Sequence, residues 1–260
     1  MKEGTFMSNT ESKPYGTVLL KADQILRFLS GSAGPQRLNV IAKSTGLTNS
    51  TASKIINTLV LIGYVKKDPK TNEFDLGPSI IKYAKQSLKQ LDIKKIAQPH
   101  LETLQRITTE TVHLGVIENA KIIYITKIES NNPVTLYSQI GRSIPLYCSA
   151  MGKSILAGQS TEEIDQYLDE HELIPKTENT FTTKNSFKNE LKTIKKQGYA
   201  FDNGEHEADV FCVGTTITVN GNNFGAFSVS VPKYRITETI TNEIIEAVRN
   251  CKAAIEDELQ

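Results

Sequence analysis

The alternation of apolar and polar residues is most informative over residues 46–59, where it has the period of a helix. Apolar residues and one threonine fall near one side, at spacings of three and four: Leu47, Thr51, Ile55, Ile56 and Leu59. The opposite side carries short polar residues and one lysine: Asn49, Ser50, Ser53, Lys54 and Asn57. Short side chains let a helix lie close to a partner, and amides can hydrogen-bond base edges in the DNA major groove. The pattern predicts a DNA-recognition helix, with an ordinary solvated helix face as the alternative.

Neighbouring segments complete a winged helix-turn-helix. The apolar stripe over residues 18–29 predicts a first helix. A short second helix is expected from about Asn39, its N-cap, to Ser44, with Val40, Ile41 and Ala42 facing inward. Gly46 supplies the tight turn before the recognition helix. Two short alternating segments, residues 64–67 and 73–76, flank a turn and predict the β-hairpin of a wing.

Beyond residue 77 the pattern changes from helical to alternating and back. Residues 79–91 predict an amphipathic linker helix. Alternating segments predict strands, at residues 111–116 and 122–128, around Val134 and Leu136, and over the hairpin 211–231. Helical spacing predicts further helices, over residues 92–107, from about 150, over 160–168 with a Ser160/Glu163 capping box, over 185–197 and over 236–259. Pro99 is expected to kink the first of these helices or to mark its true start. The resulting fold class is α+β, with helices covering an antiparallel sheet.

Charge is uneven along the chain. The whole chain has a formal net charge of +1, whereas residues 13–75 contain nine Lys and Arg against four Asp and Glu, a local balance of +5. This imbalance favours a small DNA-contacting domain joined to a more acidic one, with chance as the alternative. Lys66 and Lys67 of the wing are expected to contact phosphate. The candidate DNA contacts are therefore Asn49, Ser50, Thr51, Ser53, Lys54, Asn57, Lys66 and Lys67.

Composition bounds the compartment and argues against several kinds of site. The three cysteines, Cys148, Cys212 and Cys251, are widely spaced, which favours a reducing compartment over a disulfide framework or a zinc site. The four histidines show no metal-ligand spacing, so we expect no metal and no cofactor. No apolar run is long enough for a membrane span, and residues 1–13 lack the apolar core of a signal peptide. We expect a cytoplasmic protein without a membrane partner, whose residues 1–14 form a disordered tail.

Three segments of the chain carry specific motifs. The first is the helix-turn-helix that begins at Thr45-Gly46-Leu47. The second runs from Gly141-Arg142 through Pro145-Leu146-Tyr147-Cys148-Ser149-Ala150-Met151-Gly152-Lys153. The third runs from Gly198-Tyr199-Ala200-Phe201-Asp202 through Cys212 to Ser228-Val229-Ser230-Val231-Pro232. In this order and spacing the chain resembles the IclR family of transcriptional regulators, from about Tyr15 to its end. It departs from the family pattern at Lys54, where many relatives have Arg, and at Tyr147, where His is common.

The resemblance implies an organisation and a function. It implies a winged helix-turn-helix DNA-binding domain (residues 15–77), a linker helix (78–91) and a GAF-like effector-binding and oligomerisation domain (92–260). Such regulators are homodimers or homotetramers that bind a double-stranded DNA operator, commonly as repressors, under the control of a small metabolite. Short carboxylic or sugar acids are the expected effectors. The family's effector pocket maps onto six residues of this sequence: Ala150, Met151, Asp202, Cys212, Ser228 and Ser230.

Elementary chemistry favours the same pocket. The backbone N–H groups at a helix start near Ala150 and Met151 are suited to a carboxylate. Ser228 and Ser230 are two apart on a strand, so their hydroxyls face one side. Each of these residues also has a simpler structural interpretation. Cys212 could be a small buried core residue, Asp202 a turn residue, and the two serines strand residues whose hydroxyls are hydrogen-bonded within the protein. The run Glu205-His206-Glu207 is expected in a solvated loop.

Two other functions compete with this one. Cys148, near a helix start, is a candidate enzyme nucleophile, although nothing close to it in the sequence supplies a histidine base. Alternatively, the C-terminal domain serves oligomerisation alone. The small-residue helix start and the paired serines favour a cavity, and hence an effector, over both.

Overall fold

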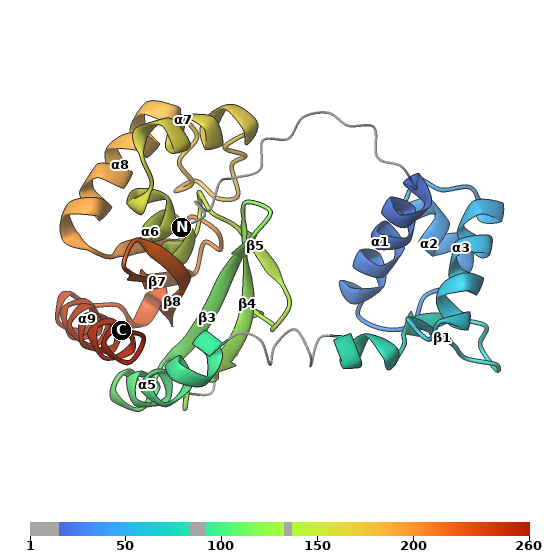
Figure 1. Ribbon diagram of the computed structural model, residues 1–260, viewed down its shortest axis with the longest axis horizontal. Coiled ribbons are helices and arrows are strands. Elements are labelled where there is room, and N and C mark those ends of the chain that lie inside the picture. The colour runs from blue at the N-terminus through green and yellow to red at the C-terminus, as the bar shows by residue number, and fades with distance from the viewer. Residues whose placement is uncertain (1–15, 84–91, 133–136) are drawn as a thin grey trace. The chain divides into compact units, whose positions relative to one another are not determined.

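The computed structural model describes residues 16–83, 92–132 and 137–260, and the chain divides into two compact units between Gln90 and Leu91 (Figure 1). Three expectations fall wholly or partly outside the described residues: the N-terminal tail, the linker helix beyond Tyr83, and the strand around Val134 and Leu136. Residues 79–83, where the linker helix is expected to begin, are helical.

The N-terminal unit has the expected order of helices and hairpin. Its elements are α1 (Thr17–Ser30), α2 (Leu38–Ser44), α3 (Asn49–Leu61), β1 (Val65–Lys67) and β2 (Phe74–Leu76). The two strands pair antiparallel, with Val65 opposite Leu76. Ile25, Ile41 and Ile56, one from each helix, are fully buried and form the centre of the core. The winged helix-turn-helix is therefore confirmed.

Two details of α2 differ from the expectation. The helix begins at Leu38 after Arg37, which makes no side-chain capping bond, so Asn39 is not the N-cap. Val40 is 40% exposed, whereas Ile41 and Ala42 are buried. Successive residues of an α-helix are turned by about 100°, so three in a row cannot all face one core.

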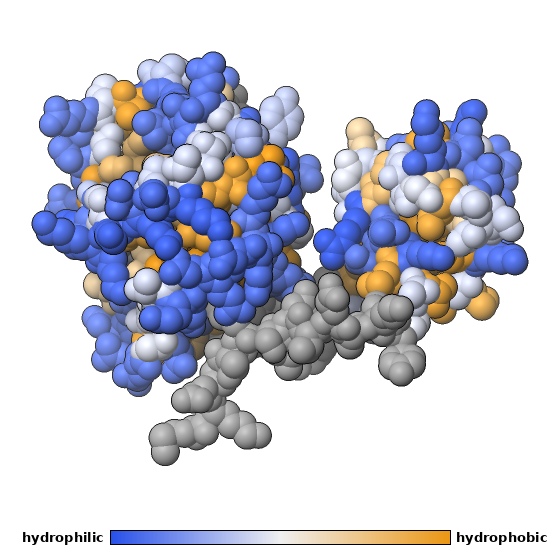
Figure 2. All heavy atoms as spheres, turned by 90° about the horizontal axis from the view of Figure 1, so that it is seen from above, coloured by the Kyte–Doolittle hydropathy of each residue, from blue (hydrophilic) through white to orange (hydrophobic). Residues whose placement is uncertain are grey.

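Exposed apolar side chains gather at the start of α1. Val18, Leu19 and Leu20 are 55%, 72% and 51% exposed, although Val18 lies on the side of the helix that buries Ile25 and Leu29. Figure 2 shows hydrophobic residues in patches between polar ones on the visible face of both units. Clustered exposed apolar residues are typical of surfaces that meet a partner.

The described part of the C-terminal unit contains a six-stranded antiparallel sheet in the order β5-β4-β3-β8-β7-β6. Its strands are β3 (Thr111–Glu118), β4 (Lys121–Ile128), β5 (Ser143–Pro145), β6 (Ala200–Asn203), β7 (Val210–Val219) and β8 (Asn222–Pro232). One face is covered by α6 (Ala150–Gly158), α7 (Thr161–Glu170) and α8 (Lys184–Gln197). On the other face α5 (Asp92–Thr108) and α9 (Glu238–Glu258) lie side by side (Figure 1). The predicted α+β class is confirmed.

Individual elements show which predictions from local sequence patterns were correct. The Ser160/Glu163 capping box is present at the start of α7. Pro99 lies inside α5, which begins at Asp92, so the proline is not the start of the helix. The pattern does not predict the edge strands β5 and β6, because three and four residues are too few for a recognisable alternation.

Candidate functional site

Helix α3 turns its short polar residues toward solvent. Asn49, Ser50, Lys54 and Asn57 are exposed, and Ser53 is half-buried. The opposite side packs into the core through Ala52, Ile55, Ile56 and Leu59. Thr51 has a different role, because its N–H donates to Thr48 Oγ1 at 3.2 Å and its own Oγ1 accepts from that hydroxyl at 2.9 Å. Thr51 therefore belongs to the N-terminal cap of the helix.

The wing lysines are exposed and weakly held. Lys66 Nζ lies 3.2 Å from the Asp75 carboxylate, and Lys67 Nζ lies 5.8 Å from the centre of the Phe74 ring. Asp68 shapes the turn by accepting the Lys70 N–H at 2.7 Å. Exposed ion pairs contribute little, so a phosphate can compete with Asp75 for Lys66.

In the C-terminal unit, all six residues predicted for the effector pocket line one cavity of about 40 Å³. Its other lining residues are His113, Tyr124, Ser138, Ile144, Ser149, His206, Glu207 and Val210. The register of the strands brings three of these residues together. Asp202 is opposite Cys212, and Cys212 is opposite Ser230. Residues directly opposite in a sheet share a face, so β6, β7 and β8 present these three side chains together.

The start of α6 is held tightly against its surroundings. A Cβ on Gly152 would lie 2.3 Å from Leu146 Cα, and a Cβ on Gly214 of β7 would lie 3.0 Å from the Met151 nitrogen. Ser149 caps the helix, accepting the Gly152 N–H at 3.2 Å. Within the part of the chain that the structure describes, the N–H groups of Ala150 and Met151 have no acceptor. They are two free donors at the positive end of a helix, beside the cavity.

A chain of hydrogen bonds crosses the sheet side of the cavity. The Cys212 thiol donates to Ser230 Oγ at 3.2 Å, and Ser230 Oγ lies 3.3 Å from His113 Nδ1. His113 Nε2 lies 2.7 Å from Ser138 Oγ. Burial, aided by the charge of Lys127, lowers the pKa of His113 to about 3, so the imidazole is neutral. A neutral ring that accepts at Nδ1 and donates at Nε2 satisfies all three bonds. His113 was not predicted as a cavity residue, because nothing close to it in the sequence indicates its partners Ser230 and Ser138.

Asp202 is both a turn residue and a cavity residue. It is 5% exposed, and its Oδ1 accepts the N–H of Glu205 at 2.6 Å and that of His206 at 3.4 Å. Burial, followed by the charge of Glu205, raises the pKa of Asp202 to about 7. The two interpretations of this residue are therefore compatible.

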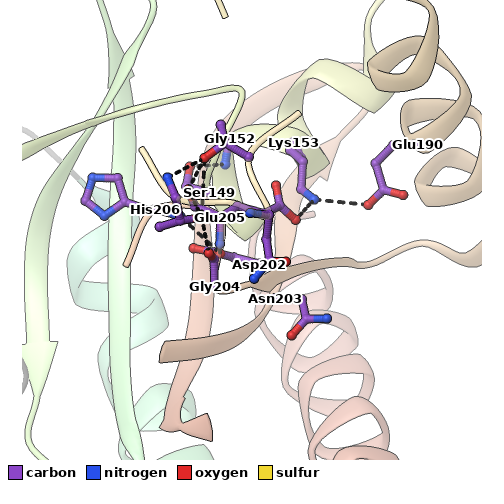
Figure 3. Close-up of polar contacts among 12 residues, drawn as sticks. Ser149, Gly152, Lys153, Glu190, Asp202, Asn203, Gly204, Glu205 and His206 are labelled. Carbon is purple, nitrogen blue, oxygen red and sulfur yellow. Dashed lines mark hydrogen bonds and ion pairs between the residues drawn. The ribbon is translucent and has the colours of Figure 1, made fainter. Parts of the chain in front are cut away.

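The segment after Asp202 is not the solvated loop that we expected. Glu205 is only 4% exposed, because its side chain turns inward to Lys153. Lys153 of α6 is fully buried, and its Nζ lies 2.5 Å from Glu205 Oε1 and 3.0 Å from Glu190 Oε1 of α8 (Figure 3). The backbone of the segment is held as well, since Thr180 Oγ1 donates to the Glu205 carbonyl at 2.7 Å. The segment after Asp202, which forms one side of the cavity, is thus anchored to α6 and, through Lys153, to α8. No local pattern in the sequence indicates this arrangement.

Cys148 does not have the properties of a nucleophile. It is fully buried, and burial raises its pKa to about 12, so the thiol stays protonated. Among the described residues, no group of histidine, cysteine and carboxylate side chains is arranged to hold a metal ion. No described helix is long and apolar enough to cross a membrane.

Comparison with known proteins gives a family match for each of the two units. The model of the IclR helix-turn-helix domain matches residues 18–69, and that of the bacterial transcriptional regulator IclR C-terminal domain matches residues 85–257. The HTH-type transcriptional regulator KdgR of Escherichia coli is 29% identical over 228 residues, covering 87% of this chain and 86% of that protein. The regulator XynR of the same organism is 30% identical, covering 76% and 78% of the two chains.

Solved structures show the same likeness. The crystal structure of Thermotoga maritima IclR has a TM-score of 0.74 and 33% identity, covering 94% of this chain and 99% of that one. An IclR homolog from Microbacterium hydrocarbonoxydans, complexed with 4-hydroxybenzoate, has a TM-score of 0.79 at 21% identity and covers 93% and 98%, which shows a common fold. These relatives are transcriptional regulators and not enzymes, in agreement with the protonated, buried Cys148. The chain belongs to the IclR family of DNA-binding transcriptional regulators.

Proposed function

We propose that this regulator is a homo-oligomeric, cytoplasmic repressor whose operator binding is controlled by a short carboxylic acid in the cavity of the C-terminal unit. The observation that carries the proposal is the pair of free N–H donors at Ala150 and Met151, which face a cavity that is also lined by the Ser228 hydroxyl. Helix N-termini bind anions through such N–H groups and the helix dipole.

The size of the cavity restricts the acid. The space open inside the cavity is about 40 Å³, which favours a small acid over a large one. Among the described lining residues there is no lysine or arginine, so neutral donors are left to bind the carboxylate. A short two- to three-carbon acid fits this description better than a sugar acid.

The N-terminal unit supports the DNA half of the proposal. Asn49, Ser50, Ser53, Lys54 and Asn57 would read base edges, while Lys66 and Lys67 contact phosphates. Two copies on a roughly palindromic operator would place two recognition helices in successive major grooves. The exposed apolar residues at the start of α1 support self-association. Effector binding and operator binding would then be coupled through residues 78–91, and that coupling must be reciprocal.

The test is a thermal-shift screen of the full chain against short carboxylic acids, followed by operator binding with the best acid. A ligand that binds only the folded state raises the melting temperature. We expect a shift that is lost in Ser228→Ala, while operator affinity without the acid stays nearly unchanged in that variant. A collapse of operator affinity in Ser228→Ala would make the serine structural. No shift with any acid would instead favour a C-terminal unit that only oligomerises.

A further inference from the structure

We infer that Asp202 is a hydrogen-bond donor to the effector, so that a carboxylate enters the cavity together with one proton taken from solution. The inference rests on the proposed function, that a small acid binds in this cavity. It adds a role for one residue and a dependence of effector affinity on pH.

The geometry leaves one oxygen of Asp202 for the ligand. Oδ1 is committed to the backbone N–H groups of Glu205 and His206. Oδ2 has no hydrogen-bond partner among the described residues, although the side chain is 95% buried and lines the cavity. If Oδ2 were ionised, it would face the carboxylate of the incoming effector with no hydrogen-bond donor between the two groups. A protonated one can donate to that carboxylate.

Charges on the loop and helix side of Asp202 are mostly negative. The neighbouring segment contributes Glu205 and Glu207, and α8 contributes Glu190. The buried cation on this side is Lys153, and it is already shared between Glu190 and Glu205. An anionic effector therefore meets a group of carboxylates whose nearest cation is fully engaged.

The strand side adds neutral groups. Burial lowers the pKa values of His113 and His206 and raises those of Tyr124 and Cys212, so all four are uncharged near neutral pH. Other described cations near the cavity each make a contact outside it: Lys127 with Glu129, Arg142 with the Tyr137 carbonyl, and Lys233 with the Asn203 carbonyl. Lys176 is exposed, and its charge is screened by solvent.

Two carboxylates that share a buried site cannot both remain ionised without a cation, so one of them keeps a proton. In the empty cavity, burial and Glu205 already hold the pKa of Asp202 at about 7. A bound carboxylate raises that pKa further. Below about pH 7 the proton is already present, and affinity is flat. Above it, affinity falls by up to about tenfold per pH unit, until the pKa of the complex is reached.

The experiment is isothermal titration of the full chain with pyruvate, and with glycolate and acetate as further probes, in two amine buffers suited to each pH. These buffers differ in ionisation enthalpy, so the difference in heat counts the protons taken up. We expect uptake approaching one proton at about pH 8 and close to none at about pH 6. Asp202→Asn, whose amide still accepts at Oδ1 and donates toward the cavity, should bind without uptake and with little pH dependence. Asp169→Asn, an exposed carboxylate on α7, is the matched control and should behave as the parent chain does.

The outcomes separate the two proposals. Binding of an acid without proton uptake at about pH 8, or full uptake in Asp202→Asn, overturns this inference and leaves the proposed function intact. No binding of any of the three acids overturns both. Should Asp202→Asn not fold, infrared difference spectra of the parent chain give the answer. A protonated-carboxyl band that appears when acetate, which has no ketone carbonyl of its own, is added at about pH 8 supports the inference, and its absence overturns it.

Discussion

The DNA-facing side of α3 and the cavity of the C-terminal unit are both polar, but they are built in different ways. The α3 residues lie within residues 49–57, on one helix, and are mostly exposed. The cavity residues are spread from His113 to Ser230, and several are almost fully buried. An exposed polar side chain has water as its alternative partner, whereas a buried one must find partners within the protein. A substitution on α3 should therefore change DNA recognition without destabilising the fold. A substitution in or beside the cavity should change both acid binding and the free energy of unfolding.

The largest expected effect tests this coupling at Lys153. Lys153→Met leaves Glu205 and Glu190 without their buried cation. Removing one partner of a buried ion pair costs about 3–5 kcal/mol. We expect a loss of this order in the free energy of unfolding, measured by urea denaturation, with part of it recovered in the double variant Lys153→Met/Glu205→Gln.

The matched control for Lys153 is Lys184→Met, which removes an exposed ion pair with Asp169. Its effect on the free energy of unfolding should be small, because exposed pairs contribute little. Equal losses of unfolding free energy in the two lysine variants would contradict the idea that a buried ion pair holds the segment after Asp202 in place.

A smaller effect is expected from two glycines of the same helix. A Cβ on Gly152 would meet the backbone of Leu146, whereas a Cβ on Gly158 has no neighbour within 4 Å. Gly152→Ala should therefore cost about 1–3 kcal/mol by overpacking and weaken acid binding by displacing the Ala150 and Met151 N–H groups. Gly158→Ala should leave the thermal shift unchanged. Unaltered acid binding in a folded Gly152→Ala chain would show that these N–H groups do not hold the ligand.

The smallest effect on stability is expected on α3, where the effect on recognition should be clear. Asn57→Ala removes an exposed amide and should change the unfolding free energy by less than about 0.5 kcal/mol. If the amide reads a base edge, operator affinity should fall by about 1–3 kcal/mol while nonspecific DNA binding is retained. Binding assays on operator and random duplexes measure both.

Lys66→Gln sharpens the contrast with Asn57→Ala. Loss of a phosphate contact should weaken binding to both duplexes alike and lower the slope of log affinity against log salt by about one. If Asn57→Ala gave the same uniform loss, α3 would not be the base-reading element.

Local pattern predicted most of the fold, for identifiable reasons. The helical stripe ending at Leu59 and the turn at Gly46 depend on spacing within a few residues, so they could be inferred directly. The short strands β5 and β6, the cap of α2 and the exposure of Val40 could not, because each depends on packing against distant segments. The six pocket residues came from the resemblance to a family, and chemistry alone supported only the helix start and the two serines.

The sequence by itself therefore determined the element order, the polar side of α3 and the family, since these depend on spacing along the chain. The tertiary structure decided which polar groups face one another. Strand register sets Asp202 beside Cys212 and Ser230, and the packing of α6 and α8 brings Lys153 to Glu205 and Glu190. Burial then changes the chemistry of those groups: it raises the pKa of Asp202, lowers that of His113 and keeps the Cys148 thiol protonated. Desolvation is a property of the whole packed unit, so no stretch of sequence states it.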